Sequence, residues 1–340
     1  MKKKALITGI SGQDGAYLAQ FLISKNYKVY GGDRRTASGS LWRLKKLGID
    51  DKVQILDFEL AEDTNIHKII KEGQFNEIYN LAAQSFVGSS FDTPLMTSNI
   101  NAFGTLRILE AIRYYSKKTK FYQASTSEMF GGLKDEKFQN EMSRFRPKSP
   151  YAVSKLYAHW ISNIYREGYN LFCCSGILFN HESPIRGDEF VTKKIVKGLC
   201  KIKFAEGKPL EVGNIYSKRD WGFAKDYVEI MWKMLQQKKP DDYVISTGET
   251  HTIKEFINKA CKIIGFKPKW KGKGLNEKCY DLNSDKVIVK INKKYFRPAE
   301  VDFLRGDNTK ARRILNWKPK TSFIQLVKLM CEDEIELYKK

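Results

Sequence analysis

The chain has 340 residues, of which 42% are hydrophobic and 29% charged; this length suits two domains, and the composition is too apolar for a disordered protein. Sixty Lys and Arg against 39 Asp and Glu give a net charge of +21, so nucleic acid, an anionic membrane and a phosphorylated small molecule are candidate partners. No apolar run approaches the roughly 18 residues of a membrane span, and residues 1–8 lack the long apolar region of a signal peptide.

The six cysteines form no CxxC pair and show no zinc-type spacing. Two of them are adjacent inside an apolar run, which is typical of buried thiols. We therefore expect reduced thiols, no metal site and a cytoplasmic location. The cysteines are Cys173, Cys174, Cys200, Cys261, Cys279 and Cys331.

The first 35 residues give the clearest local pattern. Residues 4–8 are a short apolar run, residues 9–15 carry three glycines, and residues 28–31 are a second apolar run. The helix predicted between them has one apolar face, formed by Tyr17, Leu18, Phe21 and Leu22. This order of strand, glycine turn, helix and strand predicts the first half of a doubly wound nucleotide-binding fold.

Further strands are predicted at residues 53–56, 77–81, 120–125 and 172–179, with helical stretches between them such as residues 104–114. Alternation of this kind predicts an α/β, Rossmann-type doubly wound parallel sheet with helices on both faces.

The alternation loosens after a polar turn predicted at residues 180–184. We expect a dinucleotide-binding domain at residues 1–180 and a smaller mixed α/β substrate domain at residues 181–340, with some later elements returning to the first domain.

Two later segments are distinctive. A final helix at about residues 322–337 places Phe323, Leu326, Val327 and Met330 on one face, which predicts a core or a subunit interface. Residues 262–294 hold ten Lys and three acidic residues, and we expect them to form a solvated surface.

The glycine turn predicts a dinucleotide site. Gly9, Gly12 and Gly15 recur at every third residue. Such a turn after a strand lets the backbone approach a pyrophosphate, which then lies at the positive end of the helix.

The residues after the second strand bear on which dinucleotide binds. Asp33 lies 24 residues beyond Gly9, near the expected distance for an acid that binds the ribose 2′-hydroxyl of NAD. Arg34 and Arg35 follow it, and guanidinium groups suit the 2′-phosphate of NADP. On residue types alone, both cofactors remain open.

Tyr151 and Lys155 are four residues apart and therefore share one face of a predicted helix. A phenol normally titrates near pH 10, but a nearby ammonium and a cationic nicotinamide would both favour phenolate, which makes Tyr151 a candidate base. The preceding predicted strand ends at Thr126 and Glu128, and the carboxyl end of a parallel strand opens toward the ligand crevice.

Five segments, in the same order along nearly the whole chain, are similar to those of the GDP-mannose 4,6-dehydratases, a family of the extended short-chain dehydrogenase/reductase superfamily. They are residues 6–15 (LITGISGQDG), 121–128 (FYQASTSE), 176–184 (GILFNHESP), 219–222 (RDWG) and 295–301 (YFRPAEV).

The resemblance implies a tightly held NADP that takes a hydride from C4 of GDP-mannose, with Tyr151 as the base and Lys155 beside it. The C4 ketone acidifies the C5 proton, which Glu128 removes, and water leaves from C6 close to Thr126. Return of the hydride to C6 gives GDP-4-keto-6-deoxymannose, so the expected enzyme is a hydro-lyase. A carboxylate beside the Tyr base separates elimination from simple oxidation, because elimination needs a second proton-transfer group.

The resemblance also implies binding residues. Besides Tyr151 and Lys155, the cofactor positions are Gly9, Gly12, Gln13, Asp14, Gly15, Arg34, Arg35, Glu59, Leu60, Leu81, Ala83, Gln84, Ser85, His181 and Arg186. The positions implied for the GDP-sugar are Ser85, Asn180, Lys194, Gly213, Arg219, Arg297 and Glu300. Arginine suits the diphosphate, and a carboxylate can accept from the guanine N1 and N2 donors.

In the family, the loop that matches Arg34 and Arg35 reaches a neighbouring subunit's cofactor in a tetramer. A homo-oligomer, either dimer or tetramer, is therefore implied, and NADP is favoured over NAD. Neither nucleic acid nor a membrane is expected as a partner.

Some positions depart from the family pattern. Asp33 stands where members are often basic or neutral, Glu59 where Asp is common, and Met96 where Tyr is frequent. The segment at residues 128–151 is slightly long and borders the expected sugar site, so a GDP-manno-heptose is an alternative substrate. A GDP-4-keto-6-deoxymannose reductase is an alternative activity on the same fold, and a non-catalytic polyanion binder is the alternative from another class.

Overall fold

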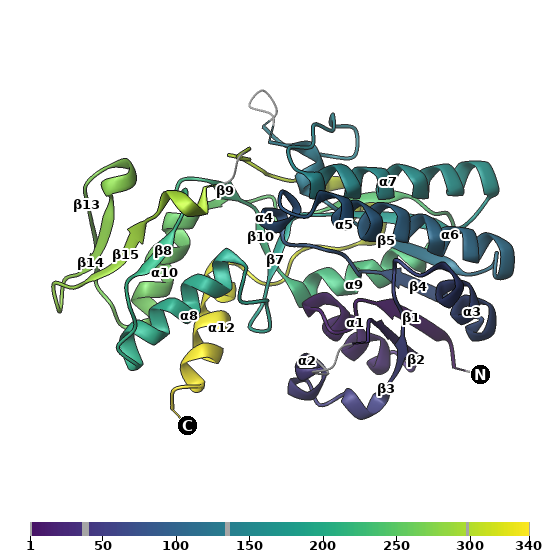
Figure 1. Ribbon diagram of the computed structural model, residues 1–340, viewed down its shortest axis with the longest axis horizontal. Coiled ribbons are helices and arrows are strands. Elements are labelled where there is room, and N and C mark those ends of the chain that lie inside the picture. The colour runs from purple at the N-terminus through teal and green to yellow at the C-terminus, as the bar shows by residue number, and fades with distance from the viewer. Residues whose placement is uncertain (1, 36–40, 133–136, 297–298, 340) are drawn as a thin grey trace.

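The architecture is taken from a computed structural model, which describes residues 2–35, 41–132, 137–296 and 299–339. The larger part, on the right of Figure 1, holds a sheet between layers of helices. The smaller part, on the left, holds a second sheet beside three helices, and the C-terminal helix lies there.

A seven-stranded, wholly parallel sheet forms the larger part. Its strands are β1 (Lys4–Thr8), β2 (Lys28–Asp33), β3 (Val53–Asp57), β4 (Glu77–Asn80), β5 (Lys120–Thr126), β6 (Cys173–Leu178) and β11 (Asp242–Ile245). Their order in the sheet is β11-β6-β5-β4-β1-β2-β3, with parallel pairing throughout. The predicted Rossmann-type doubly wound sheet is confirmed.

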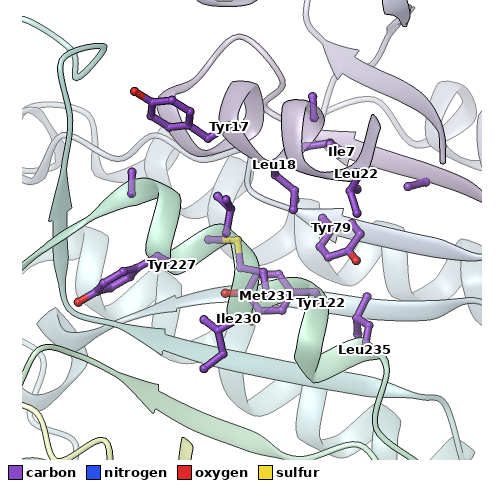
Figure 2. Close-up of a cluster of buried hydrophobic side chains, with 14 of the residues drawn as sticks. Ile7, Tyr17, Leu18, Leu22, Tyr79, Tyr122, Tyr227, Ile230, Met231 and Leu235 are labelled. Carbon is purple, nitrogen blue, oxygen red and sulfur yellow. The ribbon is translucent and has the colours of Figure 1, made fainter. Parts of the chain in front are cut away.

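Alternate residues of each strand face opposite helix layers, which is why the strands are continuous apolar runs in the sequence. Tyr79 and Tyr122 point toward α1 and α9 (Figure 2), whereas Ile78 and Phe121 pack with α3, α6 and α7 on the other face. The helices of this part are α1 (Gln13–Ser24), α2 (Trp42–Lys46), α3 (Asp63–Gly73), α4 (Val87–Ser90), α5 (Pro94–Ser98), α6 (Gly104–Tyr115), α7 (Pro150–Tyr169), α9 (Ala224–Leu235) and α11 (Thr309–Leu315).

The smaller part has its own apolar core, between a four-stranded sheet and three helices. The strand order is β13-β14-β15-β8. Its elements are β8 (Leu210–Val212), β13 (Pro268–Lys271), β14 (Lys278–Asp281), β15 (Val287–Ile291), α8 (Val191–Phe204), α10 (Ile253–Ile264) and α12 (Phe323–Glu336).

Two short strand pairs link the parts. β7 (Asn180–Glu182) runs parallel to β10 (Trp221–Phe223), and β9 (Lys218–Arg219) runs antiparallel to β12 (His251–Thr252). The polar turn predicted at residues 180–184 is thus wrong at its first three residues, because they pair with a strand some forty residues later in the chain.

The division at residue 180 is not a simple cut. α9 and β11 come after it in sequence, yet α9 packs on the larger sheet and β11 pairs with β6 at its edge. These two elements are of the kind expected to return to the first domain, and the two-domain boundary remains a prediction.

Several smaller expectations can be compared with the structure. All six cysteines are free and buried, and Phe323, Leu326, Val327 and Met330 of α12 are buried in the smaller core, so that stripe is core. Of the ten lysines at residues 262–294, nine are exposed, as predicted for a solvated surface. Across the described ranges, every helix is too short or too polar to cross a membrane.

Candidate active site

The turn between β1 and α1 brings backbone groups close together. Gly9 has φ of +70°, and a Cβ on it would lie 2.8 Å from the backbone of Ala82. A Cβ on Gly15 would lie 2.3 Å from the Gly9 carbonyl oxygen. The N-cap residue of α1 is Gly12, which has no side chain to cap the helix. The amides of this helix end are therefore available to an anion, and the turn fits the pyrophosphate of a dinucleotide.

The end of β2 packs against the same turn. The Asp33 carboxylate accepts a 3.0 Å hydrogen bond from the Ser11 hydroxyl, and burial raises the pKa of Asp33. The Ser11 carbonyl in turn accepts from Nη1 of Arg43 at 2.8 Å. Arg34 and Arg35 are exposed, whereas Asp33 is half-buried.

The segment at residues 81–85 leaves β4 beside the glycine turn. Thr8 Oγ1 accepts the first two backbone N–H groups of this segment, each at 3.1 Å. Further along, the Asn101 side chain accepts from the N–H of Gln84 at 2.9 Å and donates to its carbonyl at 3.1 Å. The strand end that includes Leu81, Ala83, Gln84 and Ser85 is thus held from two sides, with Ser85 exposed.

Glu59 and Leu60, expected on the adenine side, follow β3. The Glu59 carboxylate accepts from the Ala61 N–H at 3.1 Å and so stabilises its own turn. Leu60 is buried, and a Cβ on Gly104 would lie 2.9 Å from it. Leu60 therefore packs against the start of α6.

Thr126, Glu128 and Tyr151 meet at the carboxyl end of β5, and all three side chains are buried. The Thr126 hydroxyl oxygen accepts from the N–H of Glu128 at 3.2 Å, which caps the short helix at Ser127–Phe130. The same hydroxyl is near enough to the Tyr151 phenol to lower its pKa. Since Thr126 already accepts from Glu128, its proton is free to point at the phenol oxygen, where it stabilises phenolate.

Tyr151 and Lys155 lie one turn apart at the start of α7, whose N-cap Ser149 accepts from Ala152 N. Burial raises the pKa of Tyr151 to about 12, a rise that the Thr126 hydrogen bond opposes and the Glu128 charge reinforces. Burial lowers the pKa of Lys155 to about 8. Both shifts favour the neutral forms, so the protein by itself keeps the phenol protonated at neutral pH.

His181 joins β7 to the start of α1. Its Nε2 lies 2.7 Å from Asp14 Oδ2, and its Nδ1 lies 2.7 Å from the Phe179 carbonyl oxygen. Both neighbours are acceptors, so both ring nitrogens donate only if the imidazole is protonated. Burial alone would lower the pKa of His181, but the Asp14 charge outweighs it and raises the pKa. Gln13 adds a bond to the His181 carbonyl at 3.1 Å and accepts from Ser183 at 2.6 Å.

Arg186 lies next to this pair. Its Nε is 3.1 Å from the buried Glu182 carboxylate, and its guanidinium stacks 3.5 Å above the centre of the Phe190 ring. Both Arg186 and Asp14 are close enough to affect the pKa of Tyr151. The predicted cofactor residues Asp14 and Arg186 therefore lie near Tyr151.

The residues expected to hold GDP form two contacts in the smaller part. Lys194 Nζ lies 3.3 Å from the centre of the Tyr295 ring, and a Cβ on Gly213 would lie 2.4 Å from the Tyr295 carbonyl oxygen. Separately, Arg219 Nη2 lies 3.5 Å from Glu300 Oε1. Asn180 is opposite Trp221 in the β7–β10 pair, and the predicted Arg297 lies outside the described residues.

Comparison with known proteins shows which family has this sequence. The family model described as GDP-mannose 4,6 dehydratase matches residues 6–330. The chain belongs to the GDP-mannose 4,6-dehydratase family.

Curated members of the family match over almost the whole chain. The GDP-mannose 4,6 dehydratase of Drosophila melanogaster is 49% identical over 99% of this chain and 87% of its own length. The human protein of that name is 47% identical, with coverage of 98% and 92%, and the Vibrio cholerae protein is 45% identical, with coverage of 99% and 95%.

Solved structures share the fold at lower identity. A dTDP-glucose 4,6-dehydratase from Bacillus anthracis in complex with NAD has a TM-score of 0.81 at 22% identity, covering 99% of this chain and 98% of that one. The RMD protein from Pseudomonas aeruginosa, complexed with NADPH, has a TM-score of 0.76 at 21% identity, covering 98% and 100%. The extended short-chain dehydrogenase/reductase fold expected for the family is thus confirmed.

In this GDP-mannose 4,6-dehydratase family member, three residues that local sequence patterns do not indicate help to build the candidate site. Asn101 lies in a π-helical turn before α6 and holds both Gln84 and Ser154. Arg43 bridges the carbonyls of Ser11 and Ile185. Tyr295 packs against Lys194, and it stands inside a segment already recognised as similar to the family.

Proposed function

We propose that this chain is a hydro-lyase that converts GDP-mannose to GDP-4-keto-6-deoxymannose with a bound nicotinamide dinucleotide. Its membership of the family supports this activity. The observation that carries the chemistry is the meeting of Thr126, Glu128 and Tyr151 at the end of β5, beside the glycine turn. Two proton-transfer groups at one sugar site suit an elimination that follows an oxidation.

Oxidation at C4 needs a base for the hydroxyl proton. A nicotinamide held at the glycine turn would supply the hydride acceptor for C4 and the hydride donor for C6. Tyr151 receives the O4 proton, and the Thr126 hydroxyl stabilises the phenolate that does so. Because burial holds the pKa of the phenol at about 12 in the protein alone, the positive charge of the oxidised nicotinamide is needed to bring that pKa toward neutrality.

Elimination then uses the second group. A ketone at C4 makes the C5 proton acidic, and Glu128 removes it. The same carboxyl group gives the proton to the leaving C6 hydroxyl, so water departs. After the hydride is returned to C6, Tyr151 donates its stored proton to C5, and both side chains regain their starting protonation states.

We propose NADP as the dinucleotide. The glycine turn and the N-terminus of α1, whose N-cap residue is Gly12, fit a pyrophosphate. Arg34, Arg35 and Arg43 put guanidinium groups around the end of β2. The Asp33 carboxylate already accepts a hydrogen bond from Ser11, and this bond competes with one from a ribose hydroxyl. Arginines in this position suit a 2′-phosphate.

We place the GDP part of the substrate in the smaller part of the molecule. Arg219 offers a guanidinium to the diphosphate, Lys194 offers an ammonium, and Glu300 offers a carboxylate to the guanine donors. The ion pair between Arg219 and Glu300 shows that these two side chains already face each other.

One assay tests this function and its cofactor. Purified protein supplied with GDP-mannose and NADP, but with no reductant, should form an alkali-sensitive 4-keto product, and NAD in place of NADP should support a lower rate. Product formation that consumes reduced dinucleotide stoichiometrically would contradict the proposal and favour a reductase. If GDP-mannose is inert and GDP-manno-heptose reacts, the chemistry stands and the hexose assignment is wrong.

We further propose a homo-oligomer built on α7. This helix exposes Val153, Tyr157, Trp160 and Ile164 along one stripe, which spans roughly 16 Å of helix. Phe103 touches Tyr157, and Leu95 and Met96 of α5 are exposed beside it. A second copy of the same chain would cover this apolar face by a two-fold arrangement, since isologous contacts need only one self-complementary patch.

Trp160→Glu is expected to convert the oligomer to a monomer, because it places a charge at the centre of the apolar stripe. Sedimentation velocity would give the molar mass of each form. Leu282→Glu serves as the control, since Leu282 is similarly exposed, at 56% against 51% for Trp160, but lies in the smaller part. A wild-type protein that sediments as a monomer would contradict the proposal.

A further inference from the structure

Asp220 lies between β9 and β10, and its side chain is fully buried. Oδ1 accepts from the backbone N–H of Thr247 at 2.8 Å and from its hydroxyl at 2.6 Å. Oδ2 accepts from the N–H of Gly248 at 2.9 Å and from that of Gly306 at 3.3 Å. One carboxylate therefore joins three chain segments that are far apart in sequence.

Two of these three segments lead to residues proposed to hold the GDP-sugar. Arg219 directly precedes Asp220, and β10 directly follows it and pairs with β7 at Asn180. The segment before Gly306 contains Asp302, whose carbonyl accepts from the N–H of Lys218 at 2.9 Å, and Glu300 lies two residues earlier. A shift of Asp220 would therefore alter how Arg219 and Glu300 face each other.

The chemistry of this site requires a carboxylate. Burial raises the pKa of Asp220 to about 6, even though four hydrogen bonds oppose the rise. Each oxygen accepts at least one bond from a backbone N–H, so an amide in its place would set its NH₂ group against a backbone donor whichever way it turned. Buried donors left without acceptors are costly, and the three segments would move apart.

We propose that Asp220 is the positioning residue for the GDP part of the substrate, holding Thr247, Gly248 and Gly306 so that Arg219 and Glu300 converge on one nucleotide. This rests on the proposed function. Among the described residues, the hydrogen bonds to Asp220 come from Thr247, Gly248 and Gly306, so Asp220 governs substrate affinity and leaves the chemical step to Glu128 and Tyr151.

The test is calorimetric titration of GDP into the full chain. Asp220→Asn is expected to weaken GDP binding by at least about tenfold and to raise KM for GDP-mannose by the same factor, with kcat within about threefold of the wild type. Thr247→Val, which removes one of the four donors and is the milder change, should weaken GDP binding by about threefold.

Asp226→Asn is the matched control. Asp226 is also buried, and its carboxylate accepts from the N–H groups of Lys320 and Thr321, both at 3.0 Å, on the larger part. Its loss should lower the unfolding temperature and leave the GDP affinity unchanged.

The outcomes separate this inference from the function on which it rests. Wild-type protein that does not bind GDP would overturn both. Wild-type protein that binds GDP, with Asp220→Asn and Thr247→Val binding equally well, would overturn the positioning role alone. Equal weakening by Asp226→Asn would also overturn it, because the effect would then follow stability and not the nucleotide site.

Discussion

Glu128→Gln is expected to slow the dehydration of GDP-mannose by about 10³-fold while C4 oxidation continues. Glutamine keeps the size of the side chain but cannot take the C5 proton. The C4 ketone should therefore form without losing water, and reduced nicotinamide should accumulate on the protein. Absorbance of the reduced nicotinamide during a single turnover measures this directly.

Tyr151→Phe separates the two proton transfers. The phenol is the base for the first step, so its loss should abolish reduced nicotinamide as well as product. In deuterated water, wild-type turnover should place solvent deuterium at C5, whereas neither variant should exchange the C5 proton. Glu128→Gln should therefore oxidise C4 and Tyr151→Phe should not, whereas both should fail to remove the C5 proton.

Glu334→Gln is the control for losing a buried carboxylate. Glu334 pairs with Lys193 at 2.7 Å in the core of the smaller part, away from β5, so this variant should lose stability and keep its turnover. Full turnover by Glu128→Gln would refute the assigned role, as would accumulation of reduced nicotinamide by Tyr151→Phe.

The parts of the site that could be predicted are those that depend on residues close together in the sequence. Gly9, Gly12 and Gly15 follow a short apolar run, and Tyr151 and Lys155 share a helix face by spacing alone. Placing Thr126 and Glu128 at the ligand side needed only the rule that parallel strands open at their carboxyl ends. These signals come from a few adjacent residues, and the structure keeps them close together.

The remaining parts depend on partners that are distant in the chain. His181 is paired with Asp14, 167 residues away, and the strand that carries it exists because it pairs with β10. Asn101 sits within an unremarkable helical run, and its role arises only where Gln84 and Ser154 meet it. No periodicity of the sequence could indicate such contacts.

Burial is the other property that residue types did not convey. From residue types alone, the Lys155 ammonium was expected to help Tyr151 ionise. In the folded chain, burial lowers the pKa of Lys155 to about 8 and raises that of Tyr151 to about 12. Burial thus disfavours the charged forms of Tyr151 and Lys155 that catalysis needs. We expect this to lower the free energy of unfolding.

Lys155→Met is accordingly expected to stabilise the protein at neutral pH by as much as about 3 kcal/mol while it lowers turnover by about 10³-fold. The folded pKa lies below the ordinary value of 10.5, so the unfolded chain holds this proton more tightly. The penalty on the folded state is full below about pH 8 and fades as the pH rises toward 10.5. Urea unfolding of the wild type and of Lys155→Met, both without dinucleotide, gives the measurement. The difference between their free energies of unfolding should be smaller at about pH 10 than at neutral pH.

Lys193→Met should behave in the opposite way. Lys193 is also a buried lysine, but it donates to the Glu334 carboxylate, and its removal leaves that charge unpaired. Breaking a buried pair costs about 3–5 kcal/mol, so this variant should be less stable and remain active. If Lys155→Met is also less stable than the wild type at neutral pH, the ammonium has favourable partners in the folded state. The Lys155 ammonium would then stabilise the folded state, and the conclusion that its burial destabilises that state would be wrong.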